Sequence, residues 1–211
     1  MAHSLAVAHV DDPALAQLAA GGFDIAHAFD AHAAAAEPGW ACLAPPAPAR
    51  GLLLGNTRAL WAPFSAAVAG GALAGLADPL DAYTERAVTA AFPGARVYLA
   101  HRTYAGHYLP FQRLAVATGL GALSPSQLVI HPEFGPWFAL RAVVVVPGTA
   151  PVRAPIPRAC VCTGACERAF AAAATTTTLR PWLAVRDACS LAAHRYDDAH
   201  IAFHYDRALG T

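Results

Sequence analysis

The 211-residue sequence predicts a single α+β domain rather than a doubly wound parallel sheet. Apolar strand-like runs and helix-like segments mix along the chain without a regular strand–helix–strand alternation. Neither of the common glycine-rich phosphate motifs, G-x-G-x-x-G after a strand or the Walker loop, is present, and we find no internal repeat. The length suffices for one sizeable hydrophobic core and does not require two domains.

Several positions mark where helices begin. Asp78 is expected to cap a helix that starts at Pro79, since proline suits the first helical turn, where no backbone N–H is needed, and we expect this helix to run to about residue 91. A helix over residues 57–68 would be capped by Asn56 or Thr57 and shortened by Pro63. The remaining expected helices span residues 13–20, 110–118 and about 167–173, 182–189 and 197–205.

Short apolar runs bounded by turn residues predict the strands. These runs cover residues 51–55, 95–100, 128–130 and 138–146. Residues 21–40 are alanine-rich and carry no clear pattern, and residues 44–50, 151–157 and 175–178 read as connections. We therefore expect a poorly defined Ala/Pro-rich segment at residues 1–50, followed by the main domain at residues 51–211.

The composition is that of a folded chain without strong charge. Hydrophobic residues make up 56% of the sequence and charged residues 13%, which excludes a disordered chain. The 14 basic residues, all arginine, balance 14 acidic ones, so nothing favours nucleic acid as a partner. No signal peptide or convincing membrane span is evident, and the odd count of five cysteines favours reduced thiols. We expect a cytoplasmic protein without a membrane partner.

Residues 127–148, QLVIHPEFGPWFALRAVVVVPG, are the most informative segment. Arg141 lies inside an apolar strand-like run, where burying its charge costs several kcal/mol unless it meets an anion. This predicts an apolar cavity with one cation, suited to a large apolar ligand that carries or meets an acidic group. Alternatively, Arg141 pairs with a core carboxylate such as Glu133 or Asp187.

Residues 130–148, IHPEFGPWFALRAVVVVPG, resemble the core signature of the cblC-type cobalamin-processing proteins, the cyanocobalamin reductase/alkylcobalamin dealkylase family. LLLGNTRALWAPF, LADPLDAYTERAV, RPWLAVRDA and RYDDAHIAFHYDRAL are similar to further family segments, so the resemblance covers residues 50–210. It implies a nitroreductase-like α+β fold, with a mixed sheet flanked by helices, and makes residues 51–211 a cobalamin-processing domain.

The resemblance also implies a chemistry. The family binds base-off cobalamin and removes its upper axial ligand, either reductively with reduced flavin (FMN or FAD) or by transfer to the thiolate of glutathione. No catalytic side chain is assigned, since glutathione supplies the thiol. The implied thiol-binding residues are Arg141, Arg186, Arg207 and Trp182. The implied corrin contacts are His101, Leu114, Ala115, Val116, Val129 and Leu140. A downstream cobalamin-trafficking protein would be a further partner.

Two other functions stay open. The segment AVATGLGALSPSQLVIHPEFGPWF is also similar to epoxyqueuosine reductases, which pair cobalamin with iron–sulfur clusters. The cysteines that could hold such a cluster, or zinc, are Cys160, Cys162, Cys166 and Cys189. Their C-x-C-x3-C spacing lacks the tighter array of cluster proteins, so ordinary thiols are the simpler interpretation. A non-catalytic corrinoid carrier would keep the cavity without needing the arginines.

Several candidate residues also have simpler roles. Neither His131 nor His200 is expected to bind cobalt, because the nearest match to D-x-H-x-x-G, at residues 198–203, lacks the glycine. His131 more simply fixes the turn at a strand end through a ring N–H. Arg186 and Asp187 form a helix-surface pair in the plainest interpretation. The core would account for the aromatic residues Trp137, Phe138 and Trp182.

Overall fold

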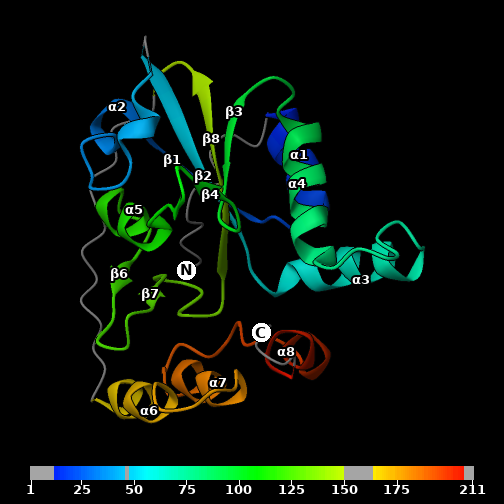
Figure 1. The fold of residues 1–211 in the computed structure, drawn as a ribbon, viewed down its shortest axis with the longest axis vertical. Coiled ribbons are helices and arrows are strands. Elements are labelled where there is room, and N and C mark those ends of the chain that lie inside the picture. Colours follow the sequence, from blue (N-terminus) through cyan, green and yellow to red (C-terminus); the bar gives the residue numbers. More distant parts are fainter. Residues whose placement is uncertain (1–11, 46–47, 150–163, 207–211) are drawn as a thin grey trace, which may run out of the picture.

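A four-stranded sheet lies at the centre of the computed structural model, which describes residues 12–45, 48–149 and 164–206 (Figure 1). Its strand order is β1-β2-β8-β3, and each neighbouring pair is antiparallel. These strands are β1 (Ile25–Asp30), β2 (Ala49–Asn56), β8 (Ala139–Pro147) and β3 (Arg96–Leu99). Two short hairpins accompany the sheet, β4 (Thr103–Tyr104) with β5 (His107–Tyr108) and β6 (Ala122–Leu123) with β7 (Val129–Ile130).

Helices cover both faces of the sheet and one of its ends, which confirms the α+β class (Figure 1). One face is covered by α1 (Pro13–Ala20), α3 (Trp61–Ala69) and α4 (Pro79–Ala91). The other is covered by α2 (Ala31–Ala34), η1 (Ala41–Leu43) and α5 (Phe111–Ala117). The helices α6 (Ala165–Ala173), α7 (Arg180–Asp187) and α8 (Asp198–Tyr205) lie at the lower end of the sheet in Figure 1.

The two central strands bury side chains on both faces. Leu52 and Leu54 of β2 belong to the core beneath α1 and α4, whereas Leu53 between them belongs to the core beneath α5. Val144 and Val143 of β8 divide in the same way. This explains why both strands read as continuous apolar runs instead of alternating ones. None of the described helices has the length and apolar character needed to span a membrane.

A β-bulge in β8 falls on the arginine that the sequence singles out. Leu54 of β2 pairs with Ala142, but the next residue, Gly55, pairs with Leu140, so Arg141 is the extra residue. Phe138 and Leu140 consequently face the same core as Val143. In a regular strand, positions 138 and 140 would face the opposite side of the sheet from position 143. Bulges redirect side chains and occur often beside functional sites. Here the bulge means that the direction of the Arg141 side chain is not set by the regular alternation of side chains between the two faces of the sheet.

Most expected elements are confirmed, including both ends of α1 and of α4. The capping role expected for Asp78 is not, because its side chain forms no capping hydrogen bond at the start of α4. The helix expected from residue 57 is instead divided into the 3₁₀ turn η2 (Arg58–Leu60) and α3, with Thr57 accepting a hydrogen bond as the cap of η2. Strand β1, by contrast, was not expected. It lies within residues 1–50 yet pairs along its whole length with β2, so the sheet crosses the expected boundary at residue 50.

Candidate functional site

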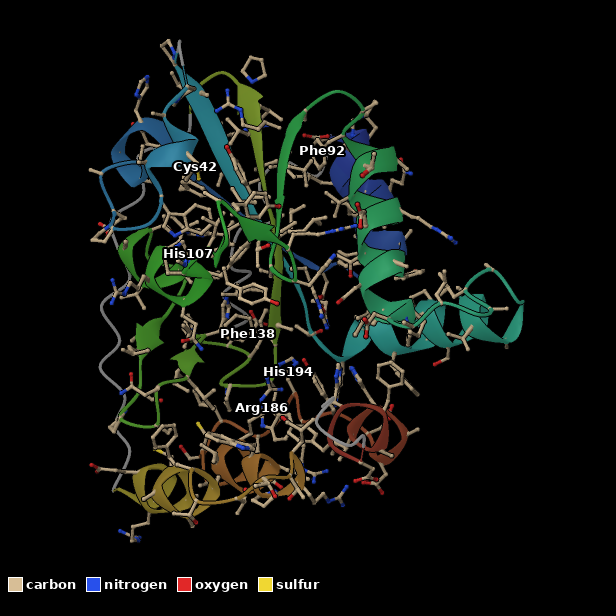
Figure 2. The ribbon with its side chains drawn as sticks, viewed as in Figure 1. Cys42, Phe92, His107, Phe138, Arg186 and His194 are labelled. Carbon is tan, nitrogen blue, oxygen red and sulfur yellow. The ribbon has the colours of Figure 1, made fainter. Side chains whose placement is uncertain are left out.

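Two of the expected thiol-binding arginines converge at the lower end of the sheet. Arg186, labelled in Figure 2, extends from α7, and Arg141 belongs to the bulge in β8. Burial lowers the pKa of Arg141 and the charge of Arg186 lowers it further, so the two guanidiniums lie near each other. The Arg186 guanidinium carbon lies 5.7 Å from the ring centre of Trp137 and 5.6 Å from that of Tyr196. Its Nη2 donates to the carbonyl oxygen of Phe138 at 3.5 Å. Arg186 therefore does not form the simple helix-surface pair with Asp187, which instead binds Arg195 at 2.7 Å.

The other two expected thiol-binding residues are not part of this convergence. Arg207 lies outside the described residues. Trp182 is half-buried and packs edge-on against Phe170 of α6, with ring centres 5.6 Å apart. Trp182 thus contributes to the contact between α6 and α7. The simpler core role applies fully to Trp137 and Phe138, which are 0% and 6% exposed.

We refer to Trp137, Arg141, Arg186, Tyr196 and His200 as the arginine cluster. The His200 ring lies between two aromatic rings, stacked on Tyr196 at 3.9 Å and on Trp61 at 5.1 Å between centres. Its Nε2 is 3.1 Å from Nε2 of His204, one turn along α8. The cluster therefore joins β8, α7 and α8 with the segment that precedes α8.

Unpaired polar atoms are concentrated in the arginine cluster. Among the described residues, five buried side-chain nitrogen or oxygen atoms lack a hydrogen-bond partner, and four of them are Trp137 Nε1, Arg141 Nη2, Tyr196 Oη and His200 Nδ1. Each such atom costs about 1–3 kcal/mol when it stays unpaired. Buried polar atoms are nearly always satisfied, so four exceptions in one place are typical of a site that ordered water, an ion or a polar ligand fills. Indole and guanidinium N–H groups are donors only, which favours an anion.

The cluster carries a positive charge at neutral pH. Burial lowers the pKa of Arg141, but a guanidinium stays protonated in proteins. Burial also lowers the pKa of His200 to about 4, so its ring is neutral. No carboxylate of the described residues forms an ion pair with Arg141 or Arg186. In place of the Glu133 or Asp187 that the sequence allowed, Arg141 has a neutral partner, because its Nε donates to Asn56 Oδ1 at 2.6 Å.

The residues expected to contact a corrin ring are only partly together. Leu114 and Ala115 of α5, Val129 of β7 and Leu140 of β8 meet in one apolar core, where the first two are 0% exposed. Val116 lies on the outer side of α5 and is 37% exposed.

His101 lies apart from that core, beside α4. Its Nδ1 is 3.5 Å from Asp81 Oδ1, and its Nε2 is 3.8 Å from Glu85 Oε2. These carboxylates hold the imidazole on the opposite side of the sheet from α5. The His101 ring therefore lies beside α4, whereas Leu114 and Val129 lie in the core beneath α5.

Large exposed apolar side chains are frequent around α5. Five such side chains are exposed among the described residues, and Tyr108, Val116 and Leu123 all fall within the 16 positions from 108 to 123. Tyr108 alone is 67% exposed. Exposed apolar side chains mark a ligand or partner surface where they form one contiguous patch, and these three share the segment around α5.

His131 fixes a turn, as expected, but with the opposite hydrogen-bond role. Its Nδ1 accepts hydrogen bonds from the backbone N–H groups of Glu133 and Phe134, at 3.1 and 3.3 Å. The expectation of a donating ring N–H was therefore wrong. The ring stacks on Phe134, and burial lowers the pKa of His131 to about 4, so a neutral, accepting ring is the stable form.

Two of the four cysteines proposed for a cluster, Cys160 and Cys162, lie outside the described residues. Cys166 is buried in α6, and Cys189 is half-buried just after α7. Within the described part of the chain, no group of three or more His, Cys, Asp or Glu side chains is arranged to hold a metal ion.

A groove of about 630 Å³ lies at the other end of the sheet from the arginine cluster. It is formed where β2 begins and β8 ends, together with the turn between α4 and β3. Phe92 and Val145 line it, and Arg96 is the charged residue of its wall. None of the residues expected to bind a thiol or a corrin ring belongs to this groove.

Sequence reasoning missed four residues of the site and its surroundings. Asn56 was considered only as a helix cap, and Trp61, Tyr196 and His200 were given no ligand role. A polar residue directly after the buried run GLLLG was a signal for Asn56, since a buried amide must find hydrogen-bond partners. The other three come together only in the folded chain, where His200 of α8 stacks on Trp61 of α3 and on Tyr196.

Comparison with known proteins identifies a related fold. A solved structure of a B12-trafficking protein CblC from C. elegans, described as a human MMACHC homologue, matches with a TM-score of 0.55 and 16% sequence identity. The match covers 89% of this chain and 87% of the other chain. No family model matches the sequence, and no curated protein matches it significantly. The α+β fold expected from the family resemblance is thus confirmed, although the described four-stranded sheet is antiparallel and not mixed.

Proposed function

We propose that this chain binds a base-off corrinoid and removes its upper axial ligand, with a carboxylate-bearing thiol held by Arg141 and Arg186. The arginine cluster is the observation that carries the proposal. Arg141 and Arg186 both belong to this cluster, which holds unpaired N–H and O–H groups, and no carboxylate of the described residues forms an ion pair with either guanidinium. Charge-assisted hydrogen bonds from arginine to carboxylate are among the strongest in proteins, and glutathione offers two carboxylates.

The corrinoid half of the proposal draws on the fold and on the surroundings of α5. The similar structure is that of a B12-trafficking protein, and the segment around α5 exposes Tyr108, Val116 and Leu123. A corrin ring is large and mostly apolar, so it suits such a surface. Arg186 connects the two halves, because it contacts both Trp137 of the cluster and the backbone of Phe138, whose side chain lies in the apolar core beside α5.

The corrinoid is the substrate in this scheme. In dealkylation, the thiolate sulfur forms a bond to the alkyl carbon, and the electron pair of the cobalt–carbon bond stays on cobalt. The protein contributes by fixing the thiol in line with that bond, since proximity and orientation lower the barrier strongly. Removal of cyanide needs an electron donor in place of the thiol, for which reduced flavin (FMN or FAD) is the class we propose.

The visible spectrum of added corrinoid tests this proposal. We expect methylcobalamin to shift to its base-off spectrum on binding and to lose its methyl group when glutathione is added. Cyanocobalamin should lose cyanide only with reduced flavin. A base-off shift that neither reagent changes would identify a carrier instead, whereas no shift with either corrinoid would refute corrinoid binding.

The iron–sulfur alternative has its own measurement. Protein purified without added corrinoid would be brown and contain stoichiometric iron and sulfide, and replacing Cys166 and Cys189 by serine would remove both. Colourless protein that retains corrinoid-dependent activity after those replacements would exclude a catalytic cluster at these positions.

We also propose a cytoplasmic location and hand-over of the product to a downstream cobalamin-trafficking protein.

A further inference from the structure

Asn56 is a fully buried amide that holds the guanidinium of Arg141. It is the last residue of β2 and is 0% exposed. Its Nδ2 donates to the carbonyl oxygen of Thr57 at 2.9 Å, which fixes the orientation of the amide. Its Oδ1 then faces Arg141 and accepts the Nε–H at 2.6 Å. The amide therefore has a defined donor side and a defined acceptor side.

This contact matters because of where Arg141 lies in its strand. As the extra residue of a bulge, Arg141 is not held by the regular alternation of side chains. An arginine side chain has many rotamers, so a bond to Nε restricts the plane in which the guanidinium can lie. Its Nη2 remains buried and unpaired beside Tyr196 and His200.

The neutrality of the partner matters as much as its position. A buried arginine is most often met by a carboxylate, which would satisfy the guanidinium and cancel its charge. An amide oxygen gives one hydrogen bond and leaves the positive charge in place. The cluster can therefore still attract an anion, because no described carboxylate forms an ion pair with Arg141, and Asp81 acts on its charge from beyond ion-pair distance.

We propose that Asn56 is a positioning residue that makes the site selective for carboxylate-bearing thiols over uncharged ones. This inference rests on the proposed function and deepens it, because it names what sets the substrate class. Asn56 acts through Arg141 and does not itself touch the thiol.

The variant Asn56→Asp separates positioning from a merely structural role, because it keeps the size and the acceptor oxygen but adds a negative charge. We expect the KM for glutathione to rise about tenfold or more, which corresponds to the loss of one charge-assisted contact. The KM for 2-mercaptoethanol, which has no carboxylate, should stay within about twofold, since no ion pair is involved. The new carboxylate gives the cation a counter-charge but loses the hydrogen bond that Asn56 Nδ2 donates to the Thr57 carbonyl oxygen, so thermal stability is measured alongside to confirm that the variant is folded.

Two further variants complete the set. Asn56→Ala removes the anchor without adding charge, so the KM for glutathione should rise and the protein should lose stability. Gln17→Glu makes the same amide-to-carboxylate change at an exposed position of α1 and should alter neither KM. A glutathione KM in Asn56→Asp equal to that of the original protein, or equal losses with both thiols, would overturn the role of Asn56.

A measurement without corrinoid distinguishes failure of this inference from failure of the proposed function. The NMR signal of the Arg141 Nε–H, assigned by its loss in Arg141→Lys, should exchange slowly in the original protein and quickly in Asn56→Ala. It should shift on addition of succinate, a thiol-free dicarboxylate, but not in Asn56→Asp. If succinate shifts the signal while methylcobalamin is not bound, the proposed function fails and the positioning role stands. If the Arg141 Nε–H of the original protein exchanges quickly, or if its signal does not shift when succinate is added, the positioning role is refuted.

Discussion

At the scale of single residues, the guanidinium of Arg141 is the group on which thiol binding should depend most. We expect Arg141→Ala to raise the KM for glutathione by an amount equivalent to about 1.5–3 kcal/mol, the usual contribution of a hydrogen bond to a charged group. Corrinoid affinity should change little, because the apolar residues beside α5 are untouched. Kinetics with methylcobalamin and a base-off titration measure the two quantities separately.

The control for this variant is Arg102→Ala, which removes an arginine that is 58% exposed and paired with Glu85. It should leave both quantities unchanged, since surface ion pairs contribute little. Equal loss of thiol use and corrinoid binding in Arg141→Ala would contradict the assignment of Arg141 to the thiol.

His200 should make the stability of the fold depend on pH. Burial lowers its pKa to about 4, with Asp197 opposing that shift and Arg141 and Arg186 adding to it, while Tyr196 and His204 pack against its ring. In the unfolded chain the pKa is about 6.5, so the unfolded state binds the proton first as the pH falls. The free energy of unfolding should therefore be highest above about pH 6.5 and decrease towards pH 4, by up to about 3 kcal/mol from this group.

The variant His200→Phe tests this dependence, because it keeps a ring between Trp61 and Tyr196. Urea denaturation at several pH values should show a flatter profile between pH 6.5 and 4 than in the original protein. The profile should not become fully flat, because burial lowers the pKa of His131 to about 4 as well. An unchanged slope would show that His200 takes up its proton equally in both states.

At the scale of elements, the pairing of β1 with β2 depends on a missing side chain. Gly51 pairs with Phe29, and a Cβ at residue 51 would overlap the Phe29 ring. We expect Gly51→Ala to destabilise the fold by about 1–3 kcal/mol, the usual cost of overpacking a core. Chemical denaturation measures this loss, and the double variant Gly51→Ala with Phe29→Leu should recover part of it. A purely additive double variant would contradict the contact.

Across the molecule as a whole, residues 12–45 contribute to the main core. Trp40 is 0% exposed and lies edge-on against Phe111 of α5 at 5.2 Å, while its Nε1 donates to the carbonyl oxygen of Pro110 at 3.2 Å. We expect Trp40→Ala to reduce the free energy of unfolding by about 3–5 kcal/mol. Replacing the half-buried Trp182 by alanine should reduce the free energy of unfolding clearly less. Similar losses at both positions would argue against this role of the N-terminal segment.

Much of the fold could be predicted from local sequence, because local chemistry decides those elements. Asp12 and Pro13 begin α1 with a side-chain hydrogen bond to Ala14 N at 3.0 Å, and Pro79 begins α4. Strand β1 escaped prediction because IAHAFD owes its stability to the partner strand β2 and not to its own pattern. The bulge at Arg141 is likewise a property of two paired strands and has no signal in one of them.

Local sequence was enough to predict the α+β class, most helix and strand positions and an arginine inside an apolar strand, since these follow from periodicity, capping and the residue order of each run. The packing of distant segments places Tyr196 and His200 in the same cluster as the two arginines, places His101 beside α4 and makes Asn56 the neutral partner of the Arg141 guanidinium. Such contacts join residues up to 85 positions apart, and the choice among possible partners depends on packing distances that no local pattern encodes.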